Sequence, residues 1–384
     1  MRILLIAPYP VLPPSTGGKI RIVRIAEALV DLGIEVTVLT PFKPGQKRHR
    51  RDVAFELRQV VYPFLLPFLL TDRPFPFMYL VSHHPWFGRS MQSWLRTFDL
   101  VQFEHVAFAD LLHRLAPGQP VVYDAHNVEF DYVRQECGSE WTRRIAGDRI
   151  RGLERILVDE SSLVLTCSTE DRNRLGELYG LAQEKVLIIQ NGIHSPVSPM
   201  NGTATDPPWS DRVARLPRKA MFSGSDVAHN RQAVAFIVQQ LAPLLRQTCG
   251  FIIQGECGRR FLNQGGDNVD FDPHWNTFRQ YARPGVVGLN PVVQGSGSNL
   301  KLAHYLAHGM PVLSTEFGVR GFMDVAPFVH VRALEAFAEA LRSERFEPPN
   351  AGAHLARLSW GALAARLRDS YLQLIERAQS PAKK

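Results

Sequence analysis

The first forty residues constrain the fold more than any other part of the sequence. Residues 2–7 form a short apolar run, as expected of a buried parallel strand, and prolines and the pair Gly17-Gly18 follow. Residues 19–32 place apolar side chains at helical spacing, and residues 35–40 read as a second strand. A strand, a glycine loop, a helix and a strand in this order predict a Rossmann-type βαβ unit.

The same pattern continues along the chain and begins again in its second half. Further strands are predicted at Leu100–Phe103, Val121–Asp124, Leu163–Cys167, Val186–Gln190, Ala220–Ser223, Gly250–Gln254, Val286–Asn290 and Pro311–Ser314, with helices at Trp141–Glu160 and Gln232–Arg246. Residues 195–217 are rich in proline and small polar residues and predict a linker. We therefore expect an α/β fold of two doubly wound domains, at residues 1–194 and 218–359.

Composition narrows the classes of partner. The chain has 384 residues and a net charge of +7, which favours anionic partners such as nucleotides, phosphates or an acidic membrane surface. No nucleic-acid-binding motif accompanies that charge, so we expect no nucleic-acid partner. The four cysteines have no CxxC spacing, which argues against a zinc or dithiol site and favours a reducing, cytoplasmic environment.

One segment of the first half could contact a membrane. Residues 43–52 are strongly basic, and apolar and aromatic residues follow as far as residue 80. A solvated basic loop before an apolar helix would explain this pattern. The alternative is a peripheral patch over residues 43–80, with basic side chains on anionic headgroups of the inner membrane face and aromatic rings in the interface.

Two stretches of the first half could bind a ligand. Gly17-Gly18 would let a ligand approach the backbone at a helix start, whose amides favour phosphate, although a plain tight turn would look the same. Asp124-Ala125-His126-Asn127 follows a strand, and ligands of open α/β sheets lie at the carboxyl ends of strands. His126 could be a structural hydrogen-bonding residue or part of a site.

The most informative stretch is QGSGSNLKLAHYLAHG, residues 294–309. A loop of small polar residues leads into an amphipathic helix that starts near Asn299 and ends at Gly309. Lys301 in the first turn is unfavourable for the helix dipole, and a phosphate bound to the helix start would reverse that cost. The alternative is that Lys301 points into solvent.

With these motifs the chain resembles the glycosyltransferase group 1 family, also called family 4, with the GT-B fold. The resemblance rests on MRILLIAPYP with the glycine pair, YDAHNVE (123–129), VLTCSTEDRNRL (164–175), VLIIQNGI (186–193), MFSGS (221–225) with Asn230, GSGSNLKLAHYLAHGMPVLST (295–315) and GVRGF (318–322). It implies two Rossmann-like domains facing across a cleft, with the closing helix at 360–384 joined to the first. It also implies a nucleotide-sugar co-substrate, retention of anomeric configuration, and neither a metal nor a cofactor.

The resemblance assigns roles to individual residues. The catalytic candidates are His126, beside the transferred sugar, and Lys301, which would stabilise the charge gained by the leaving diphosphate. Glu104 and Asn127 are the acceptor candidates. The candidate donor-binding residues are Gly17, Gly18, Gly224, Ser225, Asn230, Ser296, Gly297, Ser298, Asn299, Leu300 and His304.

The sequence departs from the family pattern at four of these positions. Ser225 and Asn230 stand where many members carry an arginine and a lysine, and Ser296 and His304 stand where many carry glutamates. His304 could still donate a hydrogen bond to a ribose hydroxyl. The candidates to supply the missing positive charge are Lys301, Arg231 and Lys19.

Three functions follow from these observations. The first is a retaining glycosyltransferase that moves a sugar from a nucleotide-sugar to a glycan or lipid-linked acceptor in polysaccharide or glycoconjugate biosynthesis. The second is a catalytically weakened glycosyltransferase-like binding protein or partner subunit, which the altered donor positions favour. The third is a GT-B relative such as a nucleotide-sugar epimerase, which the glycine loop does not exclude.

Overall fold

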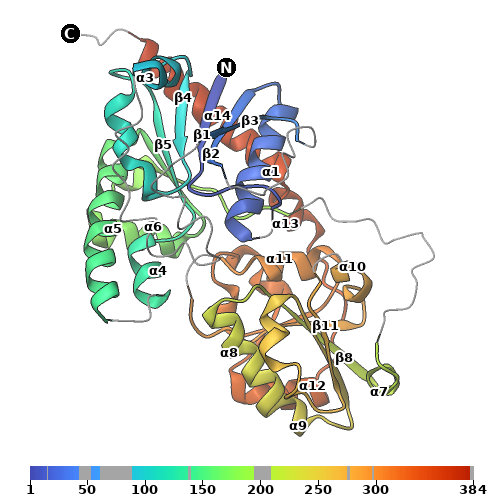
Figure 1. Cartoon of the computed structure of the whole chain (residues 1–384). Coiled ribbons are helices and arrows are strands. Elements are labelled where there is room, and N and C mark those ends of the chain that lie inside the picture. Colours follow the sequence, from blue (N-terminus) through green and yellow to red (C-terminus); the bar gives the residue numbers. More distant parts are fainter. Residues whose placement is uncertain are drawn as a thin grey trace. The chain divides into compact units, whose positions relative to one another are not determined.

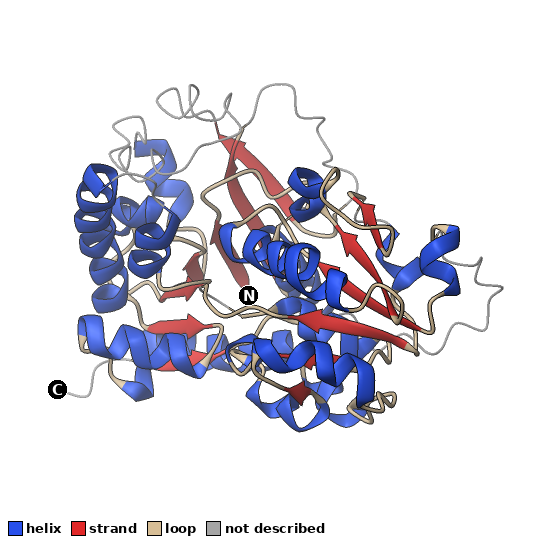
Figure 2. Cartoon of the chain, turned by 90° about the horizontal axis from the view of Figure 1, so that it is seen from below, coloured by secondary structure: helices blue, strands red, loops and turns tan. Residues whose placement is uncertain are grey.

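The computed structural model describes residues 1–14, 16–42, 53–60, 89–136, 140–193, 209–274, 277–295 and 298–380. The chain divides into two compact units: unit 1 is Met1–Asn191 with Trp360–Lys384, and unit 2 is Gly192–Ser359. Each unit is a parallel sheet with helices packed on it (Figures 1 and 2). Among the described residues, no helix has the length and apolar character needed to span a membrane.

Unit 1 contains a seven-stranded sheet of order β3-β2-β1-β4-β5-β6-β7, in which all neighbours are parallel. The strands are β1 (Arg2–Ile6), β2 (Glu35–Pro41), β3 (Glu56–Val60), β4 (Leu100–Phe103), β5 (Val121–Ala125), β6 (Leu163–Thr166) and β7 (Val186–Ile188). The strand order reverses direction between β1 and β4. Ligands of open α/β sheets bind beyond the carboxyl ends of the strands at such a point.

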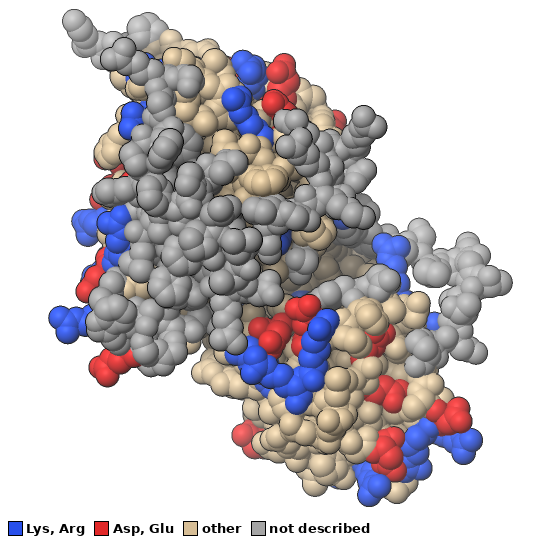
Figure 3. All heavy atoms as spheres, in the orientation of Figure 1, with Lys and Arg blue, Asp and Glu red and all other residues tan. Residues whose placement is uncertain are grey.

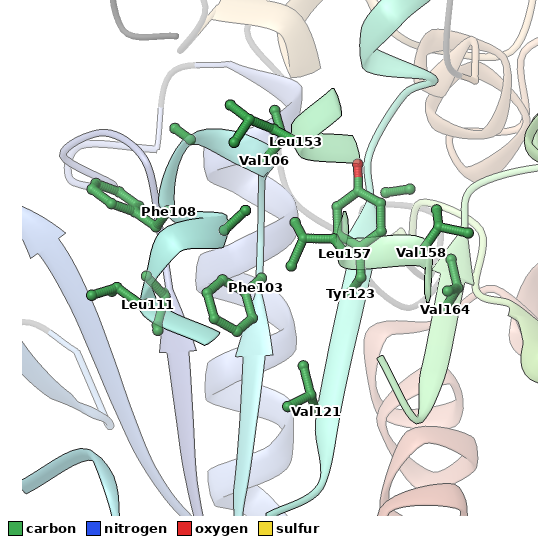
Figure 4. Close-up of a cluster of buried hydrophobic side chains, with 14 of the residues drawn as sticks. Phe103, Val106, Phe108, Leu111, Val121, Tyr123, Leu153, Leu157, Val158 and Val164 are labelled. Carbon is green, nitrogen blue, oxygen red and sulfur yellow. The ribbon is translucent and has the colours of Figure 1, made fainter. Parts of the chain in front are cut away.

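Two helical layers cover this sheet. The helices are α1 (Gly17–Asp31), α3 (Arg89–Leu95), η3 (Val106–Arg114), α4 (Glu129–Glu136), α5 (Glu140–Glu160), α6 (Thr169–Tyr179), η4 (Gln183–Lys185) and α14 (Trp360–Gln379). One core contains Phe103 and Tyr123 packed against Leu153 and Leu157 of α5 (Figure 4). The other core holds α1 and α14 against the opposite face of the sheet.

Unit 2 contains a six-stranded parallel sheet of order β10-β9-β8-β11-β12-β13. The strands are β8 (Arg218–Ser223), β9 (Cys249–Gln254), β10 (Val269–Asp272), β11 (Val286–Asn290), β12 (Val312–Ser314) and β13 (His330–Val331). Its order reverses between β8 and β11, as the order of unit 1 reverses between β1 and β4. The chain therefore builds the same sheet topology twice.

The helices of unit 2 include three-residue and longer 3₁₀ segments and one π-helical turn. They are α7 (Asp211–Arg215), α8 (Ala228–Phe236), the π-helix η5 (Ile237–Leu241), α9 (Ala242–Leu244), η6 (Glu256–Phe261), α10 (Phe278–Tyr281), α11 (Leu300–Ala307), η8 (Phe317–Val319), η9 (Met323–Phe328), η10 (Leu334–Ala336), α12 (Phe337–Ser343) and α13 (Gly352–Arg357). Separate apolar clusters lie on the two faces of this sheet.

The structure corrects several local predictions. The helix predicted to start at Gln232 starts at Ala228, and β3, β10 and β13 were not predicted. Residues 211–215, within the predicted linker, form α7 and contact β9. The basic residues 43–52 and the apolar residues 61–80 lie outside the described residues, so the membrane-contact hypothesis stays a prediction.

Candidate functional site

A buried ion pair lies at the switch point of unit 1. The guanidinium of Arg21, on α1, donates from Nε and Nη2 to the two carboxylate oxygens of Asp124 at 2.9 Å each. The two side chains are 1% and 0% exposed. Burial alone would raise the pKa of Asp124, but the charge of Arg21 and hydrogen bonds from Arg21 and His126 outweigh it and lower the pKa to about 2. Asp124 is therefore a permanent anion beneath α1.

His126 lies over this pair, just beyond the end of β5. Its Nε2 is 2.9 Å from a carboxylate oxygen of Glu104 and 3.6 Å from one of Asp124, and its side chain is 9% exposed. Burial opposes a charge on the ring, but hydrogen bonds and charges of the two carboxylates outweigh burial and raise the pKa of His126 to about 9. At neutral pH His126 is an imidazolium, which can donate a hydrogen bond but cannot accept a proton.

Gly18 contacts the same residues. It belongs to the first turn of α1, as does Gly17, so the glycine pair predicted to precede the helix opens it instead. A Cβ added at Gly18 would overlap the Tyr9 hydroxyl and lie 3.2 Å from Nδ1 of His126, whereas one at Gly17 would meet nothing within 4 Å. Gly18 is thus required for the close approach of His126 and Tyr9 to the helix start.

Three of these groups have the geometry of a metal site. One ligand atom from each of Glu104, Asp124 and His126 lies within 4.8 Å of the others. Both oxygens of Asp124 already accept from Arg21, and the other oxygen of Glu104 accepts from Gln102 at 2.7 Å. A cation here would also be repelled by the buried guanidinium. The cluster fits an ion-pair network around a charged histidine better than a metal centre.

The two acceptor candidates differ in accessibility. Glu104 is 1% exposed, and its carboxylate is bonded to His126 and Gln102. It therefore supports His126 in this structure, and its role at the acceptor stays a prediction. Asn127 is partly exposed beside His126, and its role stays a prediction.

In unit 2, the first turn of α8 packs against the glycine that follows β8. Asn230 is buried, and its amide donates to the carbonyl of Ser225 at 3.0 Å. A Cβ added at Gly224 would lie 2.7 Å from Nδ2 and 2.8 Å from Cγ of Asn230. Gly224 and Asn230 are therefore a matched pair, and Asn230 is occupied in holding this loop.

Lys301 lies on the first turn of α11, which follows β11, and its side chain extends to Asn230. Its Nζ donates to Oδ1 of Asn230 at 2.8 Å and lies 4.8 Å from the centre of the Phe222 ring. In the described part of the chain, none of the ion pairs involves Lys301. Burial lowers the pKa of its ammonium group to about 8. The solvent-pointing alternative for Lys301 is therefore wrong.

A histidine that the sequence did not flag completes the basic cluster. His229 precedes Asn230 and lies against Gly295, where an added Cβ would be 3.1 Å from its Nδ1. Burial first, and then the charges of Lys301 and Arg231, lower the pKa of His229 to about 4. Gly295 has a φ of 139°, and its carbonyl accepts from Arg320 at 3.4 Å. His229 and Arg320 thus both lie against Gly295, ahead of α11.

Arg231, a candidate to supply charge, is paired. Its guanidinium lies 3.0 Å from a carboxylate oxygen of Asp226, whose other oxygen is 3.4 Å from Arg260. The visible face of unit 2 likewise carries basic and acidic side chains next to one another (Figure 3). Lys301 is thus better placed than Arg231 to meet an anion.

The remaining donor candidates lie around α11. Asn299 is its N-cap residue, Leu300 its first residue, and the amide of Leu300 donates to the carbonyl of Ser298 at 3.0 Å. Ser296 and Gly297 lie outside the described residues. His304, one turn after Lys301, faces the Phe278 ring edge-on with centroids 6.2 Å apart.

Sequence reasoning missed Arg21, Tyr9, Gln102 and His229. Arg21 carried a usable signal, because it lies on the apolar face of its helix, four residues before Ile25. A charge on that face must be paired when buried. Gln102 carried a similar signal inside a buried strand. Tyr9 and His229 carried none, since their roles depend on contacts between distant segments.

Comparisons with known proteins agree with this arrangement. Residues 15–195 match the sequence model of Glycosyltransferase Family 4. The search of curated proteins gave no match.

Three solved structures are similar over nearly the whole chain. Sucrose-phosphate synthase from Thermosynechococcus elongatus has a TM-score of 0.71 and 17% identity, covering 98% of this chain and 100% of that one. The catalytic domain of starch synthase IV from Arabidopsis thaliana, bound to ADP and acarbose, has a TM-score of 0.65 and 13% identity, covering 98% and 99%. HepE from Anabaena, in complex with UDP and glucose, has a TM-score of 0.63 and 14% identity, covering 97% and 100%.

These likenesses establish the fold: two parallel-sheet units of this topology make a GT-B fold. The resemblance of the sequence to glycosyltransferase family 4 is also confirmed, and residues 15–195 form a domain of that family.

Proposed function

We propose that the protein is a retaining glycosyltransferase that uses a nucleotide-sugar donor without a metal or other cofactor. Unit 2 would bind the donor diphosphate at the start of α11, and unit 1 would present His126 to the transferred sugar. The acceptor would be a glycan or a lipid-linked sugar in polysaccharide or glycoconjugate biosynthesis. The similar Anabaena and Arabidopsis structures contain UDP and ADP, which supports a nucleotide as the leaving group.

The observation that carries this proposal is the environment of Lys301. A lysine with a pKa near 8, held by a neutral amide at a helix start, is a group that a nearby anion would stabilise in its charged form. The first amides of α11 carry partial positive charge as well. A diphosphate has the charge and the oxygens to meet both.

The chemistry follows from where charge develops. The bond from the sugar C1 to the diphosphate breaks and its electron pair leaves with the diphosphate, while the acceptor hydroxyl oxygen bonds to C1 and its proton passes to the departing diphosphate. Lys301 and the helix amides stabilise the growing negative charge. The imidazolium of His126 would donate a hydrogen bond to the sugar. Two fixed cations in place of a metal are consistent with a metal-independent reaction.

A donor screen with a matched lysine control tests the proposal. The wild-type protein should release nucleoside diphosphate from one or more nucleotide-sugars in the presence of EDTA. Lys301→Ala should lower that rate about 100-fold or more, the size expected for loss of one oxyanion-stabilising group. Lys219→Ala removes another partly buried lysine of unit 2, bonded to the carbonyl of Leu216, and should leave the rate within about two-fold.

Two results would contradict the proposal: turnover that depends on an added divalent metal, or equal losses in the two lysine variants. Product with inverted anomeric configuration would remove the retaining assignment. A product epimerised at another sugar carbon would indicate the epimerase alternative.

A binding protein or partner subunit is the second candidate. It is favoured by Ser225 and Asn230, because the Asn230 amide and the Ser225 carbonyl bond to each other and offer no charge to a donor. Such a protein should gain thermal stability from nucleoside diphosphates, as any ligand that prefers the folded state provides. It should show no release of diphosphate from any donor in the screen.

A further inference from the structure

A chain of hydrogen bonds links the C-terminal helix to the candidate catalytic histidine. The hydroxyl of Tyr371, on α14, donates to Oε1 of Gln102, and Nε2 of Gln102 donates to Glu104 at 2.7 Å. The other oxygen of Glu104 lies 2.9 Å from Nε2 of His126. All four residues belong to unit 1, and α14 packs beside α1 (Figure 1).

Gln102 is the unexpected member of this chain. It lies inside β4, on the same face of the sheet as Leu100, and is 0% exposed. Strands buried in a parallel sheet are usually apolar, and a buried amide destabilises the fold unless its hydrogen bonds are made. Here both ends of the amide are used: the oxygen accepts from Tyr371 and the nitrogen donates to Glu104.

Tyr371 anchors the oxygen end of that amide. The ionised carboxylate of Glu104 only accepts hydrogen bonds, so the Gln102 nitrogen must face it, and the phenol, which can donate as well as accept, donates to the remaining Gln102 oxygen. The rest of α14 is held by apolar side chains such as Leu363 and Leu367, which are fully buried. The hydroxyl of Tyr371 is therefore not needed to hold α14 on the sheet. Its hydrogen bond instead restrains the side chain of Gln102.

We propose that Tyr371, acting through Gln102, is a positioning residue that holds Glu104 against His126, so that the C-terminal helix is part of the catalytic apparatus. The role in catalysis rests on the proposed glycosyltransferase function. The orientation of His126 does not, because it is a property of unit 1 alone.

The pKa of His126 depends on the charged groups around it, so a change at Glu104 should alter it. The charged and titratable groups around His126 are Glu104 just after β4, Asp124 on β5, Arg21 on α1 and Tyr9 after β1, and Cys167, after β6, lies near Arg21 and Asp124. Loss of the Gln102 hydrogen bond would weaken the charged form of Glu104, whose pKa burial already raises. A weaker Glu104 anion lowers the pKa of His126.

The test compares two buried tyrosines. Tyr371→Phe removes the hydroxyl that bonds Gln102, and Tyr179→Phe removes one that bonds Glu154 at 2.7 Å in the other core of unit 1. The His126 ring is followed by NMR titration, with its signal assigned from the spectrum of His126→Gln. Tyr371→Phe should lower the pKa of His126 by about 0.5 to 1 unit, the size of one hydrogen bond, and Tyr179→Phe should leave it unchanged.

Kinetics give the second readout. Tyr371→Phe should lower kcat about 3- to 10-fold, move the alkaline limb of the pH–rate profile to lower pH, and leave the donor KM within about two-fold. Gln102→Leu should show the same changes, and adding Tyr371→Phe to it should add little, because both act on one chain of hydrogen bonds.

An unchanged His126 titration in Tyr371→Phe, or an equal shift in Tyr179→Phe, would overturn the inference. So would additive effects of the Tyr371 and Gln102 substitutions. If the wild-type protein turned over no donor, the proposed function would fail, while the NMR comparison would still decide the positioning role.

Discussion

The strand ends of unit 1 and unit 2 can be compared directly, because both sheets reverse their order at the corresponding place, between β1 and β4 and between β8 and β11. In unit 1, the cations Arg21 and His126 are paired with buried carboxylates. In unit 2, Lys301 lies near His229, and burial first and then the charges of Lys301 and Arg231 lower the pKa of His229. The same topology therefore carries opposite electrostatics.

The two units therefore differ in how the surroundings of a basic side chain set its pKa. Where charges are paired internally, the pKa of the histidine rises to about 9 and its side chain is fixed. At the start of α11, burial lowers the pKa of Lys301 to about 8, and a nearby anion would favour its charged form. We therefore expect unit 1 to hold a charged histidine in place and unit 2 to bind an anion.

The largest effect should come from breaking the pair in unit 1. Arg21→Met leaves the Asp124 carboxylate buried without its partner, which should cost about 3–5 kcal/mol of unfolding free energy, measured by urea titration at pH 7. Lys301→Met should change stability by less than about 1 kcal/mol, because it removes a charged group rather than leaving a buried charge without its partner.

Arg24→Met is the control for Arg21, since it removes a partly exposed arginine of the same helix, paired with Glu27 at 2.8 Å. An exposed pair of this kind contributes at most about 1 kcal/mol. A loss for Lys301→Met as large as that for Arg21→Met would remove the contrast between the two units.

Two tightly packed glycines, Gly18 in the first turn of α1 and Gly224 in the loop after β8, should show an intermediate effect. Gly18→Ala would push a methyl group into Tyr9 and His126, and Gly224→Ala would push one into Asn230. Each should lower stability by about 1–3 kcal/mol, as overpacking does, and thermal unfolding would measure it.

Gly17→Ala is the matched control, because a Cβ at that position meets nothing within 4 Å. It should leave the melting temperature unchanged or slightly higher, since alanine favours a helix over glycine. If Gly17→Ala and Gly18→Ala were equally destabilising, the close approach of His126 to α1 would not be what requires glycine.

The fold could be predicted from the sequence where burial leaves a simple pattern. Central strands such as residues 2–6 and 286–290 are continuous apolar runs, and their predicted positions agree with the structure within a residue or two. Three of the four edge strands were missed, because β3 and β10 mix polar and apolar residues and β13 has only two residues. Such segments carry no burial signal of their own.

The candidate sites could be predicted only in part. His126 and Lys301 were found because each follows a strand or opens a helix, which is local information. The contact of Lys301 with Asn230 joins residues 71 apart, and that of Arg21 with Asp124 joins residues 103 apart. No periodicity reports such pairs, so the partners that set the charges of both sites had to come from the structure.

The smallest and most diagnostic effect is the pH dependence of stability. The pKa of His126 is raised from an ordinary 6.5 to about 9, so its contribution is fully present below pH 6.5 and is lost as the pH rises to 9. The pKa of Lys301 is lowered from 10.5 to about 8, so the unfolded chain binds more protons between these values and stability rises with pH there.

The two contributions thus have opposite signs, and variants can separate them. Relative to the wild-type protein, His126→Gln should lose the fall in urea midpoint between pH 6.5 and 9, and Lys301→Met should lose the rise between pH 8 and 10.5. Each slope is shallow, at most about 1.4 kcal/mol per pH unit, and accumulates to at most about 3 kcal/mol across its window. Slopes of the same sign would mean that the basic groups of unit 2 are paired as those of unit 1 are. If the slopes are opposite and added nucleoside diphosphate reverses the Lys301 slope, then a bound anion stabilises the charged form of Lys301 in unit 2. Glu104 and Asp124 stabilise the charged form of His126 in unit 1 in the same way.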